Sequence, residues 1–190
     1  MEMVLHFQPV FNLSDEKFFD FCQLNRDVCL ERNARGEVII MPPAGGETSQ
    51  RNAEITMQLG MWAKENGTGA TFDSSGGFRM SNGAVRSPDG AWIEHTRLAS
   101  LSAEDRRRFI PLCPDFVIEL RSESDPLTGL KDKMQEYMEN GARLAWLIDP
   151  YDRKVHIYRQ GLPVEALDDP SQVSGDPMLP GFSLDMTEIW

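Results

Sequence analysis

The stretch "PDFVIELRSESD" (residues 114–125) indicates the fold more directly than any other part of the sequence. Residues 116–120 are typical of a buried β-strand, because apolar side chains follow one another and are interrupted only by Glu119. A carboxylate inside a core strand is costly unless it changes its protonation, meets an opposite charge or binds a metal. Arg121 follows two residues later. The sequence therefore raises the question of which partner Glu119 has.

Side-chain alternation divides this strand into two faces. Residues 116, 118 and 120 are apolar and share one face, whereas Glu119 and Arg121 share the other. Same-face neighbours lie about 6–7 Å apart along a strand. An ion pair between Glu119 and Arg121 is therefore the simplest interpretation of this stretch taken alone.

The composition is that of a soluble globular protein. The chain has 190 residues, of which 41% are hydrophobic and 26% are charged, and this length is enough for one domain with a core. It lacks the run of about 18 apolar residues that a membrane span needs. The N-terminal "MEMVLHFQPVF" lacks the basic and apolar regions of a signal peptide. We therefore expect a single domain over residues 1–190, located in the cytoplasm.

Cysteine, histidine and net charge exclude several classes of function. The three cysteines are odd in number and lack CxxC spacing, which argues against a disulfide framework and a zinc site, and the three histidines are scattered. The net charge of −11 argues against a general nucleic-acid coat, because such binding needs cations on phosphates. Residues 79–133, however, hold nine basic and nine acidic residues, so a locally neutral or basic groove is compatible with the sequence.

Local patterns in the first third of the chain predict two helices and a hairpin. Ser14 is expected to cap a short helix in "NLSDEKFFDFCQL", and "CLERNARGEVIIM" is expected to form a hairpin. A longer helix follows "PPAGG", with Ile55, Leu59 and Trp62 on one face and Gly67 at its end.

The remainder alternates strands and helices. "GATFD" and "VRSPDGAWI" are expected to be strands, and Pro88 in the second one indicates a bend or an edge position. "SAEDRRRF" is expected to form one or two helical turns. A helix in "PLTGLKDKMQEYMENG" precedes a hairpin of "ARLAWLIDP" and "KVHIYR", and the apolar tail "PGFSLDMTEIW" should pack on the body. This order predicts an α+β fold with a mixed or mainly antiparallel sheet flanked by helices.

Three carboxylates and one lysine lie at the edges of these elements. Asp89 begins an apolar strand that we expect to pair with residues 115–121, Glu47 opens the long helix, and Lys133 lies on the helix that follows Glu119. If the side chains converge, they suit metal-assisted phosphodiester hydrolysis. Mg²⁺ prefers carboxylate and water oxygens, and a nearby cation stabilises charge that develops on the phosphate.

The blocks "SPDG", "PDFVIELRSESD", "LKDKMQEYMENGARLAWLIDP" and "VHIYR", in this order, resemble the Uma-type family of restriction endonucleases in the PD-(D/E)XK nuclease superfamily. The resemblance runs from about "IIMPPAGGE" to the terminal "LPGFSLDMTEIW" and covers nearly the whole chain. The blocks are specific together, whereas a single block such as "PD" would carry no information. The resemblance implies a restriction-endonuclease-like core with a mixed central sheet, flanking helices and extra β-hairpins.

The resemblance also implies a metal site for Mg²⁺ or Mn²⁺. In the superfamily an aspartate on one strand and the acid of an E-x-K motif on the next strand hold the metal. Asp89 and Glu119 match these two acids, and the carbonyl of Leu120 would be an additional ligand. Glu47 matches the acid that the first core helix contributes.

The sequence departs from the superfamily pattern at position 121, where Arg121 stands in place of the lysine. An arginine can stabilise phosphate charge, but it stays protonated and cannot serve as a base. Lys133, on the adjacent helix, could take the place of the missing lysine. Both residues are therefore candidates for the catalytic cation.

These inferences predict a metal-dependent endonuclease that acts on DNA in preference to RNA. We also expect a homodimer, because a nuclease that cuts both strands often works as a symmetric pair. The alternative is a catalytically degenerate nuclease fold that binds nucleic acid or a protein partner. A purely structural or interaction protein is a third hypothesis.

Each candidate residue also has a structural explanation. Asp89 follows a proline and could be a turn residue. Glu47 lies near a helix start, where the helix dipole favours an acid, and Lys133 could lie on a solvated helix face. Residues 106–108, "RRR", suit a solvated face, and Gln135 and Tyr137 suit packing and local hydrogen bonds. The nuclease hypothesis rests on the conjunction of these residues in one order.

Overall fold

The computed structural model describes residues 3–8 and 10–190, which form two compact units. The first unit contains the chain up to Pro43 together with Gly76–Ser87 and Leu101–Cys113. The second unit contains Ala44–Ser75, Pro88–Ser100 and Pro114–Trp190. The single domain that the sequence suggests stays a prediction. Within the described residues, every helix is too short or too polar to span a membrane.

The first unit combines a five-stranded sheet with helix α1 (Asp15–Leu24). Ser14 caps this helix as predicted, and its hydroxyl accepts a hydrogen bond from the amide of Lys17. The sheet has the order β1-β3-β2-β6-β5, and its core contains Phe18 and Val38. Its elements are β1 (Met3–Leu5), β2 (Cys29–Arg32), β3 (Val38–Met41), β5 (Phe78–Arg79) and β6 (Val85–Arg86), with a 3-10 helix η1 at Asp105–Arg107.

The second unit is built on a six-stranded sheet of order β11-β10-β9-β8-β7-β4. Its strands are β4 (Gly69–Asp73), β7 (Gly90–Glu94), β8 (Phe116–Leu120), β9 (Leu144–Asp149), β10 (Lys154–Arg159) and β11 (Glu165–Asp168). Strands β8 and β9 run parallel, whereas the other neighbouring pairs in this sheet are antiparallel. The mixed sheet of the predicted α+β fold is thereby confirmed.

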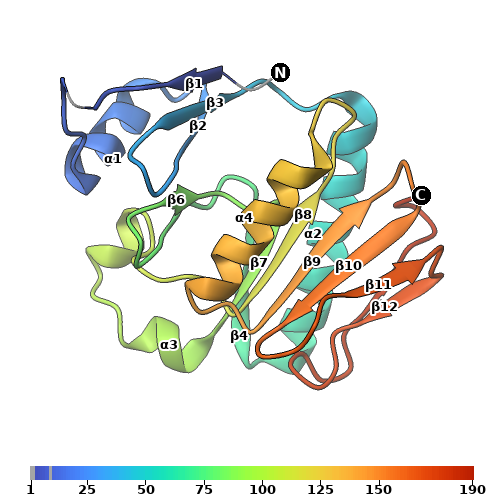
Figure 1. Cartoon of the computed structure of the whole chain (residues 1–190). Helices are drawn as coiled ribbons and strands as arrows, with labels where there is room; N and C mark the ends of the chain where they lie inside the picture. Colours follow the sequence, from blue (N-terminus) through green and yellow to red (C-terminus); the bar gives the residue numbers. More distant parts are fainter. Residues whose placement is uncertain (1–2, 9) are drawn as a thin grey trace. The chain divides into compact units, whose positions relative to one another are not determined.

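Helices α2 (Gly46–Asn66) and α4 (Leu127–Glu139) cover opposite faces of this sheet, with α4 in front and α2 behind (Figure 1). Helix α2 ends as predicted at Gly67, whose φ of 68° lies in the left-handed region that glycine accepts. Its residue Ile55 packs close to Gly90, where an added Cβ would lie 3.5 Å from the Ile55 side chain. The alternation of side chains along β8 therefore presents Ile118 to α2 and Glu119 to α4.

The C-terminal tail completes the apolar core of the second unit. The additional elements are α3 (His95–Ala99), β12 (Gln172–Ser174) and β13 (Ser183–Asp185), and β12 pairs with β13. Phe182, Leu184, Met186 and Ile189 are all buried, and the ring of Phe182 stacks on Trp146 at 5.7 Å. The prediction that the tail packs on the body is confirmed.

Residues 85–93, which were expected to form one bent strand, form two strands in different sheets. Strand β6 belongs to the five-stranded sheet, and β7 belongs to the six-stranded sheet. Pro88 lies between them and has no N–H for a strand ladder, which explains the break. Asp89 therefore lies directly before the first residue of β7.

Candidate active site

Asp89 and Glu119 lie at adjacent ends of two paired strands. Strands β7 and β8 pair antiparallel, as predicted, with Gly90 opposite Ile118. Asp89 directly precedes Gly90 and Glu119 directly follows Ile118, so the two acids lie at the same end of the paired strands. Both acids come from the second unit, so the sheet itself sets their relative positions.

Two N–H groups hold the carboxylate of Asp89. The side-chain amide of Asn52 on α2 donates a hydrogen bond to Oδ1 at 2.7 Å, and the backbone amide of Leu120 donates to Oδ2 at 2.8 Å. Donors on both oxygens fix the rotation of a carboxylate group more firmly than a donor on one. Asp89 is thus an oriented carboxylate and more than a turn residue after Pro88.

Glu119 is 4% exposed, and two side chains of α4 contact it. The ammonium of Lys133 lies 2.9 Å from Oε1, and the hydroxyl of Tyr137 donates to the same oxygen at 2.7 Å. Tyr137 is fully buried, and the Lys133 side chain is 14% exposed. A cation and a hydroxyl therefore stabilise the carboxylate inside the core strand.

Arg121 has a different partner from the one that strand spacing alone suggests. Its Nη1 lies 2.8 Å from Oδ2 of Asp149 at the end of β9, and its Nε donates to the carbonyl of Asp125. The guanidinium also lies over the ring of Tyr151, 5.5 Å from the centroid. The structure thus pairs Arg121 with Asp149 and Glu119 with Lys133, in place of an ion pair between Glu119 and Arg121.

Glu47 lies in the first turn of α2, and its side chain is 85% exposed. Its Oε2 lies 3.5 Å from Nη1 of Arg51, one helical turn later. The contacts described here thus join Asp89 to Leu120 and Glu119 to Lys133, whereas Glu47 contacts Arg51. A catalytic role for Glu47 stays a prediction.

Asn52 was not among the residues that the sequence indicates for the site, and Tyr137 was expected to serve packing and local hydrogen bonding. Asn52 lies three residues before Ile55, on the face of α2 that carries the buried residues, so a polar residue on an apolar face was the available signal. Tyr137 lies four residues after Lys133 on α4, and this spacing puts both side chains on one face of the helix. Gln135 donates to Glu139 one turn later, which is the local hydrogen bonding expected of it.

The donor set fits a hard divalent cation. Within residues 3–8 and 10–190, no cluster of three or more His, Cys, Asp or Glu side chains could hold a metal ion. Mg²⁺, however, usually takes one or two carboxylates and keeps several waters. The amide of Leu120 faces Asp89, and the N–H and C=O of one strand residue point toward the same neighbour, so its carbonyl faces the same side. The oxygens of Asp89, Glu119 and the Leu120 carbonyl are of the kind that Mg²⁺ prefers.

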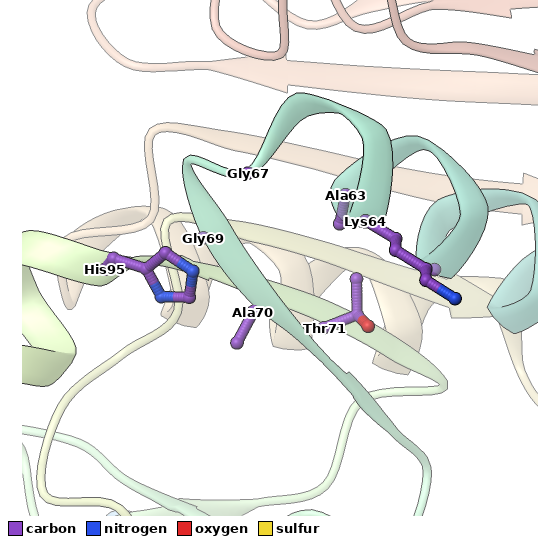
Figure 2. A pocket seen from close by; sticks show the side chains of 8 residues that line it. Ala63, Lys64, Gly67, Gly69, Ala70, Thr71 and His95 are labelled. Carbon is purple, nitrogen blue, oxygen red and sulfur yellow. The ribbon is translucent and has the colours of Figure 1, made fainter.

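A separate hollow of about 360 Å³ lies at the other end of α2, beside β4 (Figure 2). Lys64, Thr71 and His95 supply its polar side chains, and the rest of its lining is glycine and alanine. It contains neither Asp89 nor Glu119. The carboxylates at the strand ends have the residue chemistry for hydrolysis, so the strand ends are the candidate active site and this hollow is separate from it.

The mixed sheet between α2 and α4 is the fold of restriction-endonuclease-like proteins. The Uma2 family, described as "Putative restriction endonuclease", matches residues 15–187, and the chain belongs to this family. The resemblance inferred from the sequence is confirmed.

One solved structure supports the fold independently. It is a nuclease of the family DUF820 from Anabaena variabilis, described as putative, with a TM-score of 0.72 and 20% sequence identity. The match covers 85% of this chain and 89% of the other. Among curated proteins, none matches the chain.

Proposed function

We propose that the protein is a metal-dependent endonuclease that hydrolyses phosphodiester bonds in DNA. Membership of the restriction endonuclease family supports nuclease activity. The observation that carries the proposal is the pairing of β7 with β8, which brings Asp89 and Glu119 to the same end of the two strands, with the ammonium of Lys133 at 2.9 Å from Glu119. Two acids and a cation at one strand end are suited to a metal-bound phosphate.

In this proposal Asp89, Glu119 and the Leu120 carbonyl hold Mg²⁺ or Mn²⁺. The ion would lower the pKa of a bound water and offset the charge on the phosphate. The register of β7 and β8 supports this proposal, because it brings the backbone of both acids to the same end of the paired strands. Their placement on strands of a central sheet suits a site that must hold its geometry through turnover.

Lys133 has the role of the lysine in the E-x-K motif. Its ammonium can donate a hydrogen bond to a phosphate oxygen, and it stabilises the negative charge that develops as a water oxygen bonds to phosphorus and the P–O bond to the leaving group breaks. Tyr137 shares the Glu119 oxygen with Lys133 and so helps to orient the carboxylate. Arg121, which binds Asp149, is assigned to stabilising the ends of β8 and β9.

A cleavage assay tests the proposal. Supercoiled plasmid, single-stranded DNA and RNA are incubated with the wild type and Mg²⁺ or Mn²⁺, with EDTA as the metal-free control. We expect plasmid nicking or linearisation that needs the metal and that Asp89→Asn reduces at least about 100-fold. Asp73→Asn is the matched control, because Asp73 ends the neighbouring strand β4, is exposed and binds Ser75.

The assay separates the proposal from its alternative. Cleavage that persists in EDTA, or that Asp89→Asn and Asp73→Asn affect equally, would contradict it. Binding of DNA by the wild type without cleavage under any metal condition would instead favour the degenerate, binding-only module. Preference for RNA over both DNA substrates would correct the substrate class. The expected homodimer stays a prediction that the sedimentation of the same sample can test.

A further inference from the structure

Asn52 is held in place by the apolar side of α2. Ile55, Leu59 and Ala63 are buried on the face that packs on the sheet, and Asn52 continues this face one turn nearer the N-terminus. Because Ile55 packs close to Gly90, the next turn of the helix brings Asn52 to the residue before Gly90. That residue is Asp89, and the resulting hydrogen bond is 2.7 Å long.

The orientation of the Asn52 amide follows from the chemistry of its partner. An ionised carboxylate only accepts hydrogen bonds, so the amide nitrogen must face Asp89 and the amide oxygen must point away. In that orientation Oδ1 of Asn52 is enclosed and has no hydrogen-bond partner. An enclosed acceptor without a donor lowers stability, and such groups are uncommon in native proteins. An apolar side chain at position 52 would avoid this cost.

A residue that lowers stability while it orients a neighbouring acid is typical of a functional site. We propose that Asn52 is a positioning residue which, together with the Leu120 amide, fixes the carboxylate of Asp89 in the orientation that binds the divalent cation. This inference rests on the proposed function. It extends the site to the first helix of the second unit through Asn52.

The test compares Asn52→Leu with the wild type in two measurements. Leucine has the same branching and the same number of side-chain heavy atoms as asparagine, but it can neither donate to Asp89 nor leave an acceptor unpaired. The melting temperature without metal should be within about 2 °C of the wild type or higher. The affinity for Mn²⁺, measured from the electron paramagnetic resonance signal of the free ion, should fall at least about tenfold. Asn66→Leu, at the opposite end of the same helix, should leave the Mn²⁺ affinity unchanged.

The two measurements distinguish a positioning role from a structural one. A structural asparagine predicts a lower melting temperature and an unchanged Mn²⁺ affinity in the folded variant, and that result would overturn the inference. If Asn52→Leu does not fold, Asn52→Ala is measured in the same way with the same expected loss of affinity. Wild-type protein that binds no Mn²⁺ would overturn both the inference and the proposed function. Equal Mn²⁺ affinity in the wild type and the folded variant would overturn the inference about Asn52 and leave the proposed function standing.

Discussion

Each unit of the protein buries one glutamate against one cation, and the two pairs are similar in burial. In the first unit, Glu31 is paired with Arg86 at 2.9 Å, and the side chains are 2% and 10% exposed. In the second unit, Glu119 is paired with Lys133 at 2.9 Å, and the side chains are 6% and 14% exposed. Burial and distance therefore do not distinguish a structural pair from a catalytic one.

The surroundings of the two glutamates are different. The donors of Glu31 divide between its oxygens, because the Ser87 amide binds Oε1 and Arg86 binds Oε2. Lys133 and Tyr137 both contact Oε1 of Glu119. A second acid, Asp89, lies at the same end of the neighbouring strand β7. We infer that the paired acid, and not the buried ion pair as such, marks the site.

Arg86→Met should have the largest effect on stability. It leaves Glu31 buried without its cation, and removing one partner of a buried pair costs about 3–5 kcal/mol. Chemical denaturation should show this loss, and saturating Mg²⁺ should not reverse it. Recovery of stability on adding Mg²⁺ would mean that the Glu31 pair also responds to metal, and the comparison would fail. Arg153→Met, which breaks the exposed pair with Asp169, is the control and should cost about 1 kcal/mol or less.

Lys133→Met should reduce cleavage by about 10²–10³-fold, the usual effect of removing one group that stabilises the transition state. It should also destabilise the metal-free protein, because Glu119 loses its cation beside a second acid. Unlike the loss in Arg86→Met, this loss should be partly reversed by Mg²⁺, which replaces the missing positive charge. Full cleavage activity in Lys133→Met would show that a residue other than Lys133 stabilises the transition state.

Arg121→Met should have an intermediate effect on stability and little effect on metal binding. Asp149 is almost fully buried but keeps hydrogen bonds from the amides of Tyr151 and Asp152, so the expected cost is about 1–3 kcal/mol. Calorimetry should find a Mn²⁺ affinity within about twofold of the wild type. A fall in turnover as large as that of Lys133→Met would instead make Arg121 the catalytic cation.

Asp15→Asn should have the smallest effect, because this carboxyl is half-exposed although it binds both Arg32 and Arg79. Burial raises the pKa of Asp15, but the hydrogen bonds from Arg32 and Arg79 outweigh it and hold the pKa below the ordinary value of 3.8. Water screens such pairs, so we expect a loss of about 1 kcal/mol or less at pH 7.

The difference between Asp15→Asn and the wild type should have a defined pH dependence. A lowered pKa stabilises the fold above the unfolded value, and this stabilisation is lost as the pH falls through the folded value. Denaturation curves at pH 7 and below pH 3.8 should therefore give different values for the free energy of unfolding of the wild type minus that of Asp15→Asn. This difference should be smaller in acid. A difference that is constant with pH would show that the carboxylate charge contributes nothing.

The positions of Asp89 and Glu119 on their strands could be predicted from the sequence, because they follow from local rules. Strand alternation put Glu119 on the face opposite Ile118, and the turn after Pro88 put Asp89 at a strand start. The pairing of β7 with β8 then follows from an antiparallel ladder. Short-range periodicity was therefore sufficient to position these two residues on their strands, whereas their catalytic role stays a prediction.

The partners of these acids depend on how the helices pack on the sheet, and short-range sequence patterns do not predict that packing. Which residue of α2 reaches Asp89 is decided by how Ile55 packs near Gly90, and Asn52 was missed for this reason. Spacing alone paired Glu119 with Arg121, but α4 brings Lys133 to Glu119 instead. The division of residues 85–93 between two sheets also depends on tertiary pairing.

Calorimetric titration of Mn²⁺ into the metal-free protein tests the central claim most directly, because it measures the site without requiring a substrate. The account predicts saturable binding in the wild type, at least about tenfold weaker binding in Asp89→Asn, and wild-type binding in Asp73→Asn. Circular dichroism of the three samples verifies that all are folded. Equal Mn²⁺ affinity in the wild type and Asp89→Asn, or no binding in the wild type, would contradict the claim that Asp89 and Glu119 form a metal site.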